Sequence, residues 1–233
     1  MPTVAPIYQP KAITRSIAPE KPTKVAEAES LTSAFDSITR SPQATARDSN
    51  KVLILFSGKY NRPDGIAAFL KPLGIDCVQV DNDPKDGDSS HDLLNDQFYQ
   101  TLLKQVKAGH YCAIFAAPPC STFSVARFLD KPDSPPPVRD RKHIMMLPNL
   151  PPAYQLEAKR ANALTARTCE LLMEGSKVGT QFILENPADH GDASQHSTYL
   201  DERHCPMWLF PSVKLLIEVT RAKMVTFPMC AFG

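Results

Sequence analysis

The sequence predicts a doubly wound α/β fold, in which a mostly parallel sheet carries helices on both faces. Two observations predict it. From residue 51 onward, short apolar runs of strand length alternate with segments in which apolar residues recur at helical spacing. The apolar runs are also continuous, as in strands that are covered on both faces, rather than interrupted by polar residues at every second position.

The expected elements of the first half follow one another in a regular order. A strand at 52–56 precedes a helix at 63–70 with proline in its first turn, and a strand at 76–81 ends in acidic residues. Apolar side chains then mark one face of a helix that Gly109 can end, and they are Leu94, Phe98, Leu102, Leu103 and Val106.

The second half continues the alternation with a strand at 111–117 and a proline-rich loop at about 128–152. A long helix at 155–174 follows, with Gly175 placed to end it. A strand at 181–185, a helix near 211–219 and a strand near 224–227 complete the order. The last strand resembles the first half of a hairpin, so we expect a domain that is truncated there.

Residues 1–50 differ from the rest, because they are rich in Pro, Ala, Ser and Thr and cannot bury a core. We expect a disordered leader, followed by one domain over 51–233. Within the leader, Leu31, Phe35 and Ile38 fall at helical spacing, which fits either a frayed helix that rests on the domain or a docking motif.

Length, charge and cysteine usage limit the class of protein. The chain has 233 residues and a net charge of +1, and no apolar run approaches the ~20 residues of a membrane span. This net charge excludes a protein whose whole surface is strongly basic for binding nucleic acid, but it does not exclude a local basic groove. The six cysteines lack CxxC spacing and the N-terminus lacks a signal peptide. We expect an intracellular protein with reduced thiols, no metal site and no membrane partner, and the nucleus is one candidate location.

Two residues stand out at the carboxyl ends of strands, where parallel sheets form their ligand crevice. Cys120 follows an apolar strand and two prolines, and a helix starting at Ser121 would favour its thiolate. The alternative is a buried core thiol. Glu185 ends the strand 181–185 and is expected to be desolvated and protonated in the crevice, or else to be a carboxylate satisfied by a neighbouring loop.

Several motifs occur in a fixed order along the chain: Leu55-Phe56-Ser57-Gly58, the acidic end of the second strand, Pro118-Pro119-Cys120-x-x-Phe123-Ser124 and Glu185-Asn186-Pro187. Over about 51–233 the chain resembles S-adenosylmethionine-dependent cytosine-C5 DNA methyltransferases, which have a Rossmann-like fold. It resembles more closely a group of uncharacterised methyltransferase-like proteins, some of them linked with mobile elements.

The resemblance implies roles for individual residues. Cys120 would attack C6 of a flipped-out cytosine while Glu185 holds and protonates N3. The turn Phe56-Ser57-Gly58 and Pro118 would contact S-adenosylmethionine. Three acids complete the implied cofactor site, with Asp81 or Asp83 at the ribose hydroxyls and Asp92 near the adenine.

The chain departs from the family pattern at both ends of the site. Ile54 stands where the family usually has an acid, and Lys59-Tyr60 replaces the second glycine after Gly58. We expect no target-recognition domain within 51–233, so the chain is expected to be a fragment or to read its substrate with something else. Two alternatives to a DNA methyltransferase therefore remain: a non-catalytic accessory or binding module of a mobile element, and an enzyme that acts on RNA or a free nucleotide.

A DNA partner is also suggested by the segment 127–167, where basic residues outnumber acidic ones. These side chains could guide phosphate toward the crevice, or they could form an ordinary solvated surface. They are Lys131, Arg139, Arg141, Lys142, Lys159 and Arg160.

Overall fold

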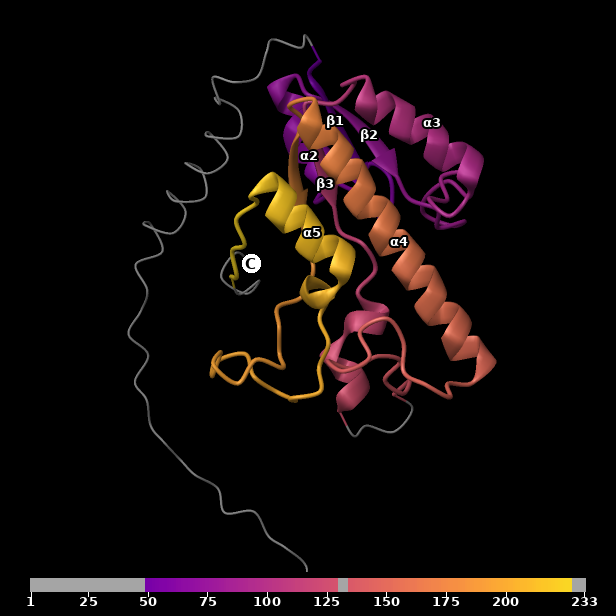
Figure 1. Ribbon diagram of the computed structural model, residues 1–233. Helices are drawn as coiled ribbons and strands as arrows, with labels where there is room; N and C mark the ends of the chain where they lie inside the picture. Colours follow the sequence, from indigo (N-terminus) through magenta and orange to yellow (C-terminus); the bar gives the residue numbers. More distant parts are fainter. Residues whose placement is uncertain (1–48, 130–133, 228–233) are drawn as a thin grey trace, which may run out of the picture. The chain divides into compact units, whose positions relative to one another are not determined.

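The computed structural model of the protein describes residues 49–129 and 134–227 (Figure 1). In these ranges a four-stranded sheet has the order β2-β1-β3-β4, and every neighbouring pair is parallel. The strands are β1 (Lys51–Leu55), β2 (Asp76–Val80), β3 (Ala113–Ala116) and β4 (Gln181–Leu184). The predicted α/β architecture with a parallel sheet is therefore confirmed. Residues 1–48 of the predicted leader, including Leu31, Phe35 and Ile38, lie outside the described residues.

The order of the strands creates a switch point beside β1. From β1 the chain moves outward to β2, and it then returns to the other side of β1 to form β3 and β4. Leu55, the last residue of β1, is in register with Val80 on one side and Ala116 on the other. The connections that leave β1 and β3 diverge at this edge, where open α/β sheets bind their ligands.

Both faces of the sheet carry helices, and β1 shows why. Leu53 and Leu55 pack on one face with apolar side chains of α3 (Asp96–Lys107), α4 (Pro152–Lys177) and α5 (Pro211–Thr220). Val52 and Ile54 pack on the opposite face, against Leu70 of the short helix α2 (Ile66–Leu70). Since successive residues of a strand point to opposite faces, a continuous apolar run supplies both cores at once.

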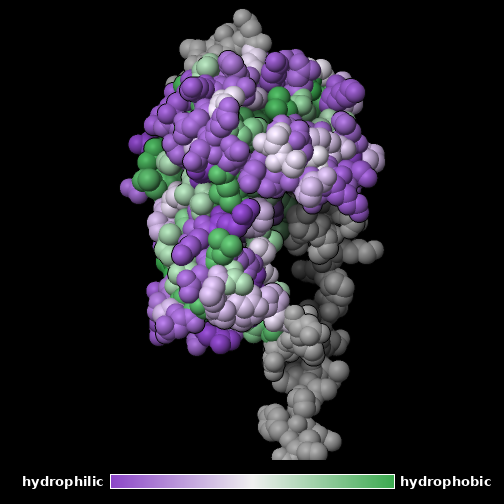
Figure 2. All heavy atoms as spheres, turned by 90° about the vertical axis from the view of Figure 1, so that its right-hand side faces the viewer, coloured by the Kyte–Doolittle hydropathy of each residue, from purple (hydrophilic) through white to green (hydrophobic). Residues whose placement is uncertain are grey.

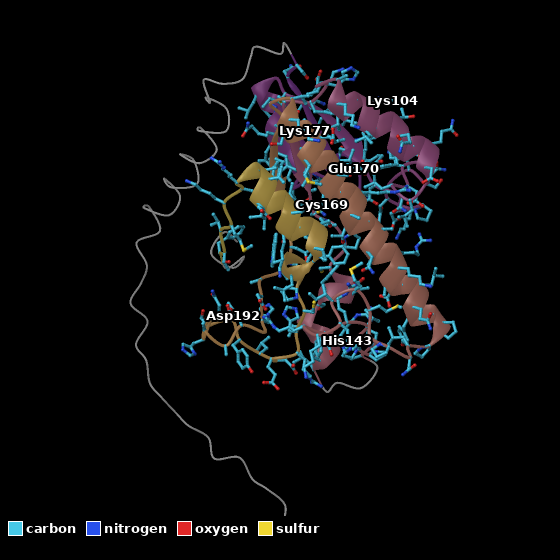
Figure 3. All side chains as sticks on the ribbon, viewed as in Figure 1. Lys104, His143, Cys169, Glu170, Lys177 and Asp192 are labelled. Carbon is cyan, nitrogen blue, oxygen red and sulfur yellow. The ribbon has the colours of Figure 1, made fainter. Side chains whose placement is uncertain are left out.

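The helices on the larger face lie against one another as well as on the sheet. In Figure 1, α4 runs between α5 on one side and α3 on the other. Cys169 of α4 is buried on the α5 side, where its thiol lies beside Ser212, and burial raises its pKa to about 11 (Figure 3). The surface over α3 and α4 is mainly hydrophilic, with small, separate apolar areas (Figure 2).

The expected end of α3 at Gly109 is confirmed, and local chemistry also explains where this helix begins. Asn95 caps α3 by accepting the Phe98 N–H at 3.1 Å, and Gly109 follows the helix with φ of +70°. The predicted helix 63–70 is shorter, because α2 begins at Ile66. It continues into the 3-10 turn η1 (Lys71–Leu73).

Two predictions about the second half are wrong. Gly175 lies inside α4 rather than at its end, and a Cβ there would approach Ile114 Cδ1 to 3.2 Å, so the glycine allows close packing of helix on sheet. Residues 224–227 form no strand: they are exposed, and no described strand pairs with them. The predicted hairpin beyond residue 227 lies outside the described residues.

None of the described helices combines the length and the apolarity that crossing a bilayer requires.

Candidate functional site

Cys120 lies on the loop that leaves β3, close to the carboxyl edge of the sheet. Pro118 is buried, Pro119 is exposed and Cys120 is partly buried, so the thiol is neither sealed in the core nor fully open. The expected helix after Cys120 is wrong in its length, because only the 3-10 turn η2 (Ser121–Phe123) forms there. The macrodipole of a full helix is therefore not available to the thiolate.

Glu185 follows β4, the strand next to β3, and its backbone N–H donates to the Ala116 carbonyl at 2.9 Å. Its side chain is exposed, so the predicted desolvation of this carboxyl group is wrong. The residue lies one position beyond the end of β4, where it borders a cavity that residues of the sheet and of α2 also line.

The next residue, Asn186, joins the two loops. Its side chain is 9 % exposed, and its Nδ2 donates to the Pro118 carbonyl at 2.9 Å. This bond fixes the β4 loop directly to the β3 loop, two residues from Cys120 and one from Glu185. Trp208, just before α5, also holds the β4 loop by donating from Nε1 to the Pro187 carbonyl at 2.8 Å. The two predicted catalytic residues therefore lie on loops that are hydrogen-bonded to each other.

The turn after β1 takes two left-handed conformations, at Phe56 with φ of 59° and at Gly58 with φ of 65°. The Phe56 N–H donates to the Val80 carbonyl at 2.8 Å. A residue with a side chain adopts this conformation at a cost, and such strain is concentrated at functional sites. Phe56 and Ser57 line a cavity of about 110 Å³ that Glu185 also borders.

Asp81, the first residue after β2, is hydrogen-bonded to this turn. One of its carboxylate oxygens accepts the Gly58 N–H at 2.8 Å and the other accepts the Asp83 N–H at 2.9 Å. The amide expected to bind the cofactor and the acid expected to bind its ribose are thus bonded to each other. Each carboxylate oxygen keeps a further lone pair that could accept a hydroxyl.

The other two predicted acids are engaged in their own turns. Asp83 Oδ1 accepts the N–H groups of Lys85 and Asp86, and these bonds lower the pKa of its carboxyl group. Asp92 Oδ1 accepts the Leu94 N–H at 2.8 Å before α3 begins. Neither residue is among those that line the cavity beside Phe56.

A second cavity, of about 150 Å³, lies on the α4 side of the β3 loop. Pro118, Pro119, Ser121 and Thr122 form one wall, and the other comes from α4, including Glu157 and Arg160. Cys120 itself lines neither of the two cavities, although its neighbours Pro119 and Ser121 line the second.

The turn after Cys120 is held by three buried side chains that the sequence did not single out for this role. Arg127 Nε donates to the Ser121 carbonyl at 2.7 Å, and Arg139 Nε donates to the Thr122 carbonyl at 3.1 Å. His204 bonds from Nε2 to the Phe123 carbonyl at 2.8 Å. No sequence signal connects these residues, because they are brought together only by the fold.

The expected basic surface is only partly present. Arg139 is 1 % exposed and cannot contact phosphate, so that assignment is wrong. Arg141 forms an ion pair with Asp189 at 2.6 Å, whereas Lys142, Lys159 and Arg160 are exposed. Lys131 lies outside the described residues. The loops that carry His143 and Asp192 lie at the end of the fold opposite Lys104 and Lys177 (Figure 3).

Among residues 49–129 and 134–227, no group of three His, Cys, Asp or Glu side chains is arranged to hold a metal ion. Comparison with known proteins found no matching protein-family model, no matching curated protein and no matching solved structure.

Proposed function

We propose that the crevice at the carboxyl edge of the sheet transfers a methyl group to C5 of cytosine in DNA, with Cys120 as nucleophile and Glu185 as its acid partner. One observation carries this proposal. The Asn186–Pro118 hydrogen bond, at 2.9 Å, ties together the loops of these two residues, which are 65 positions apart in the chain. The solvent access of both side chains supports a role on an external substrate.

The two side chains have complementary chemistry for this reaction. Attack of the Cys120 thiolate on C6 forms an S–C bond and pushes electron density to C5, while Glu185, in the acid form that burial under the bound base would favour, donates its proton to N3. After C5 has been alkylated, loss of the C5 proton returns the electrons that expel the thiolate. The target cytosine must leave the base stack of the DNA to reach both Cys120 and Glu185.

S-adenosylmethionine would supply the methyl group, and the residues that would hold it fit in part. Asp81 has acceptor capacity left for ribose hydroxyls, and Phe56 and Ser57 border the adjoining cavity. The Gly58 N–H does not fit in the same way, since it already donates to Asp81. Binding would require this bond to be shared or exchanged.

Covalent trapping tests the proposal. The full chain is incubated with S-adenosylmethionine and DNA containing 5-fluorocytosine, whose fluorine cannot leave as a proton does, so the adduct persists. We expect a protein–DNA species on a denaturing gel that disappears in Cys120→Ser. The matched control is Cys112→Ser, because Cys112 is an exposed thiol just before β3, whereas Cys120 follows the other end of that strand.

Cys120→Ser should also leave the free energy of unfolding within about 1 kcal/mol of the wild type, because the replacement is nearly isosteric. A larger loss would identify Cys120 as a core thiol. Parallel reactions with 5-fluorocytosine in RNA and as a free nucleotide identify the substrate class. The absence of any adduct from the wild-type chain would reject the proposed reaction.

A non-catalytic binding module is the second candidate, and one observation favours it. The bonds from Gly58 and Asp83 to the two Asp81 oxygens give this acid a structural role in the turns themselves. Such a module would keep the crevice without using the methyl donor. Calorimetry distinguishes the two, since the module would bind DNA but release no heat with S-adenosylmethionine.

A further inference from the structure

The backbone from Pro118 to Phe123 is restrained at every residue. The Pro118 carbonyl accepts from Asn186, the ring of Pro119 fixes its own φ, and the Cys120 carbonyl accepts the Phe123 N–H at 2.8 Å. The next three carbonyls accept from Arg127, Arg139 and His204. Cys120 therefore belongs to a turn in which four successive carbonyls, from Cys120 to Phe123, accept hydrogen bonds.

These three side chains reach the turn from three separate segments. Arg127 belongs to the 3-10 turn η3 (Val125–Phe128), Arg139 to the following loop, and His204 to the loop before the 3-10 turn η4 (Met207–Leu209). They are 8 %, 1 % and 1 % exposed. A turn that is held by three separate segments has less freedom to shift than one held by a single segment.

Arg139 makes the most extensive contacts. Its Nε and Nη2 bind the carbonyl and the Oγ1 of Thr122, its Nη1 binds Asn162 Oδ1 and the Ile144 carbonyl, and its guanidinium lies 4.1 Å from the centre of the Phe123 ring. Burial lowers the pKa of Arg139 to about 10, so the group is still charged at neutral pH.

None of the ion pairs in the described part of the chain includes Arg139. Burying a guanidinium without a carboxylate partner is unfavourable, and an apolar side chain would fill the same space at less cost. Only a planar guanidinium, and not an apolar side chain, can donate to two oxygens of one residue, as Arg139 does to Thr122. The contacts of Arg139 therefore point to control of the Thr122 backbone.

We propose that Arg127, Arg139 and His204 are positioning residues that hold the turn after Cys120 so that the thiol meets its substrate in one orientation. This inference rests on the proposed role of Cys120 as nucleophile. Reactions that depend on a positioned nucleophile lose about two orders of magnitude when the reacting atom moves by about 1 Å. A loosened turn should thus harm attack on a positioned base while exposing the thiol to small reagents.

The test uses the full chain with Arg139→Lys, which keeps the charge and loses the fork. Arg167→Lys is the matched control, because Arg167 also donates to a carbonyl, that of Leu93 at 2.7 Å, and also lies over a ring, that of Tyr99 at 4.6 Å. Alkylation by iodoacetamide is followed cysteine by cysteine with tandem mass spectrometry, and adduct formation with 5-fluorocytosine DNA is followed in parallel.

We expect Arg139→Lys to raise the alkylation rate of Cys120 about fivefold or more and to lower the rate of adduct formation about tenfold or more. Cys112, at the other end of β3, should keep its rate, and the buried Cys169 and Cys205 should stay unreactive. Arg167→Lys should change neither measurement at Cys120.

Other outcomes reject the inference. If Arg139→Lys makes Cys169 and Cys205 reactive together with Cys120, the residue supports the whole fold, and Thr122→Val then tests the turn alone by removing the Oγ1 acceptor. Unchanged Cys120 alkylation in Thr122→Val would overturn the proposal. If the wild type forms no adduct, the proposed reaction fails, but the alkylation rates still decide whether the turn is held in this way.

Discussion

At the scale of single residues, backbone conformation leads to a stability prediction that is independent of function. Arg221 ends α5 with φ of 55° and ψ of 33°, in the left-handed region that is unfavourable for residues with a Cβ, and its side chain is exposed. Arg221→Gly should therefore raise the free energy of unfolding by about 0.5 kcal/mol, measured by urea denaturation. Lys223→Gly is the control, because Lys223 is exposed without a positive φ. An equal gain in both variants would contradict this explanation.

At the scale of elements, the bond between Asn186 and the Pro118 carbonyl couples the ends of β3 and β4. Asn186→Ala removes the donor and leaves a buried carbonyl without its partner, so we expect a loss of about 1–3 kcal/mol in the free energy of unfolding. Thermal or urea denaturation measures this loss. Asn82→Ala is the comparison, because Asn82 is exposed on the loop after β2 and its removal should cost less than about 0.5 kcal/mol. Similar losses would show that the bond does not hold the loops together.

At the scale of the whole described molecule, stability should depend on pH through His204. The His190 N–H donates to Nδ1 of His204 at 3.0 Å and Nε2 bonds to the Phe123 carbonyl, so the fold binds the neutral ring. Burial lowers the pKa of His204, although Asp189, 3.6 Å from Nδ1, opposes this shift and His190 adds to it. Its stabilising contribution is therefore complete above about pH 6.5 and is lost as the pH falls through the lowered folded value.

The measurement is the free energy of unfolding of the wild type and of His204→Gln between pH 5 and 7.5. The wild type should lose more stability on acidification, since glutamine can keep the donor to Phe123 and does not titrate in this range. His196→Gln, at an exposed position, should leave the wild-type pH dependence unchanged. Parallel pH curves for wild type and His204→Gln would show that another group controls acid stability.

Features that depend on residues close together in the sequence were predictable, whereas features that depend on residues far apart in the chain were not. The four strands and the end of α3 were predictable because apolar runs and Gly109 act locally. The helix end predicted at Gly175 was wrong, since a glycine can end a helix but can also allow close packing. Here Ile114 and Val106 lie against Gly175. The 224–227 segment has strand composition but no strand beside it in the described sheet.

By itself, the sequence determined the parallel α/β class and the placement of Cys120 and Glu185 after two of its strands, because periodicity and strand ends are local properties. Only the tertiary structure decided that Asn186 bonds to Pro118, that Asp81 accepts the Gly58 N–H, and that Arg139 is buried beneath Thr122. Each of these contacts joins residues between 17 and 68 positions apart. Their partners are chosen by how strands and loops meet in space, which no local pattern of residues specifies.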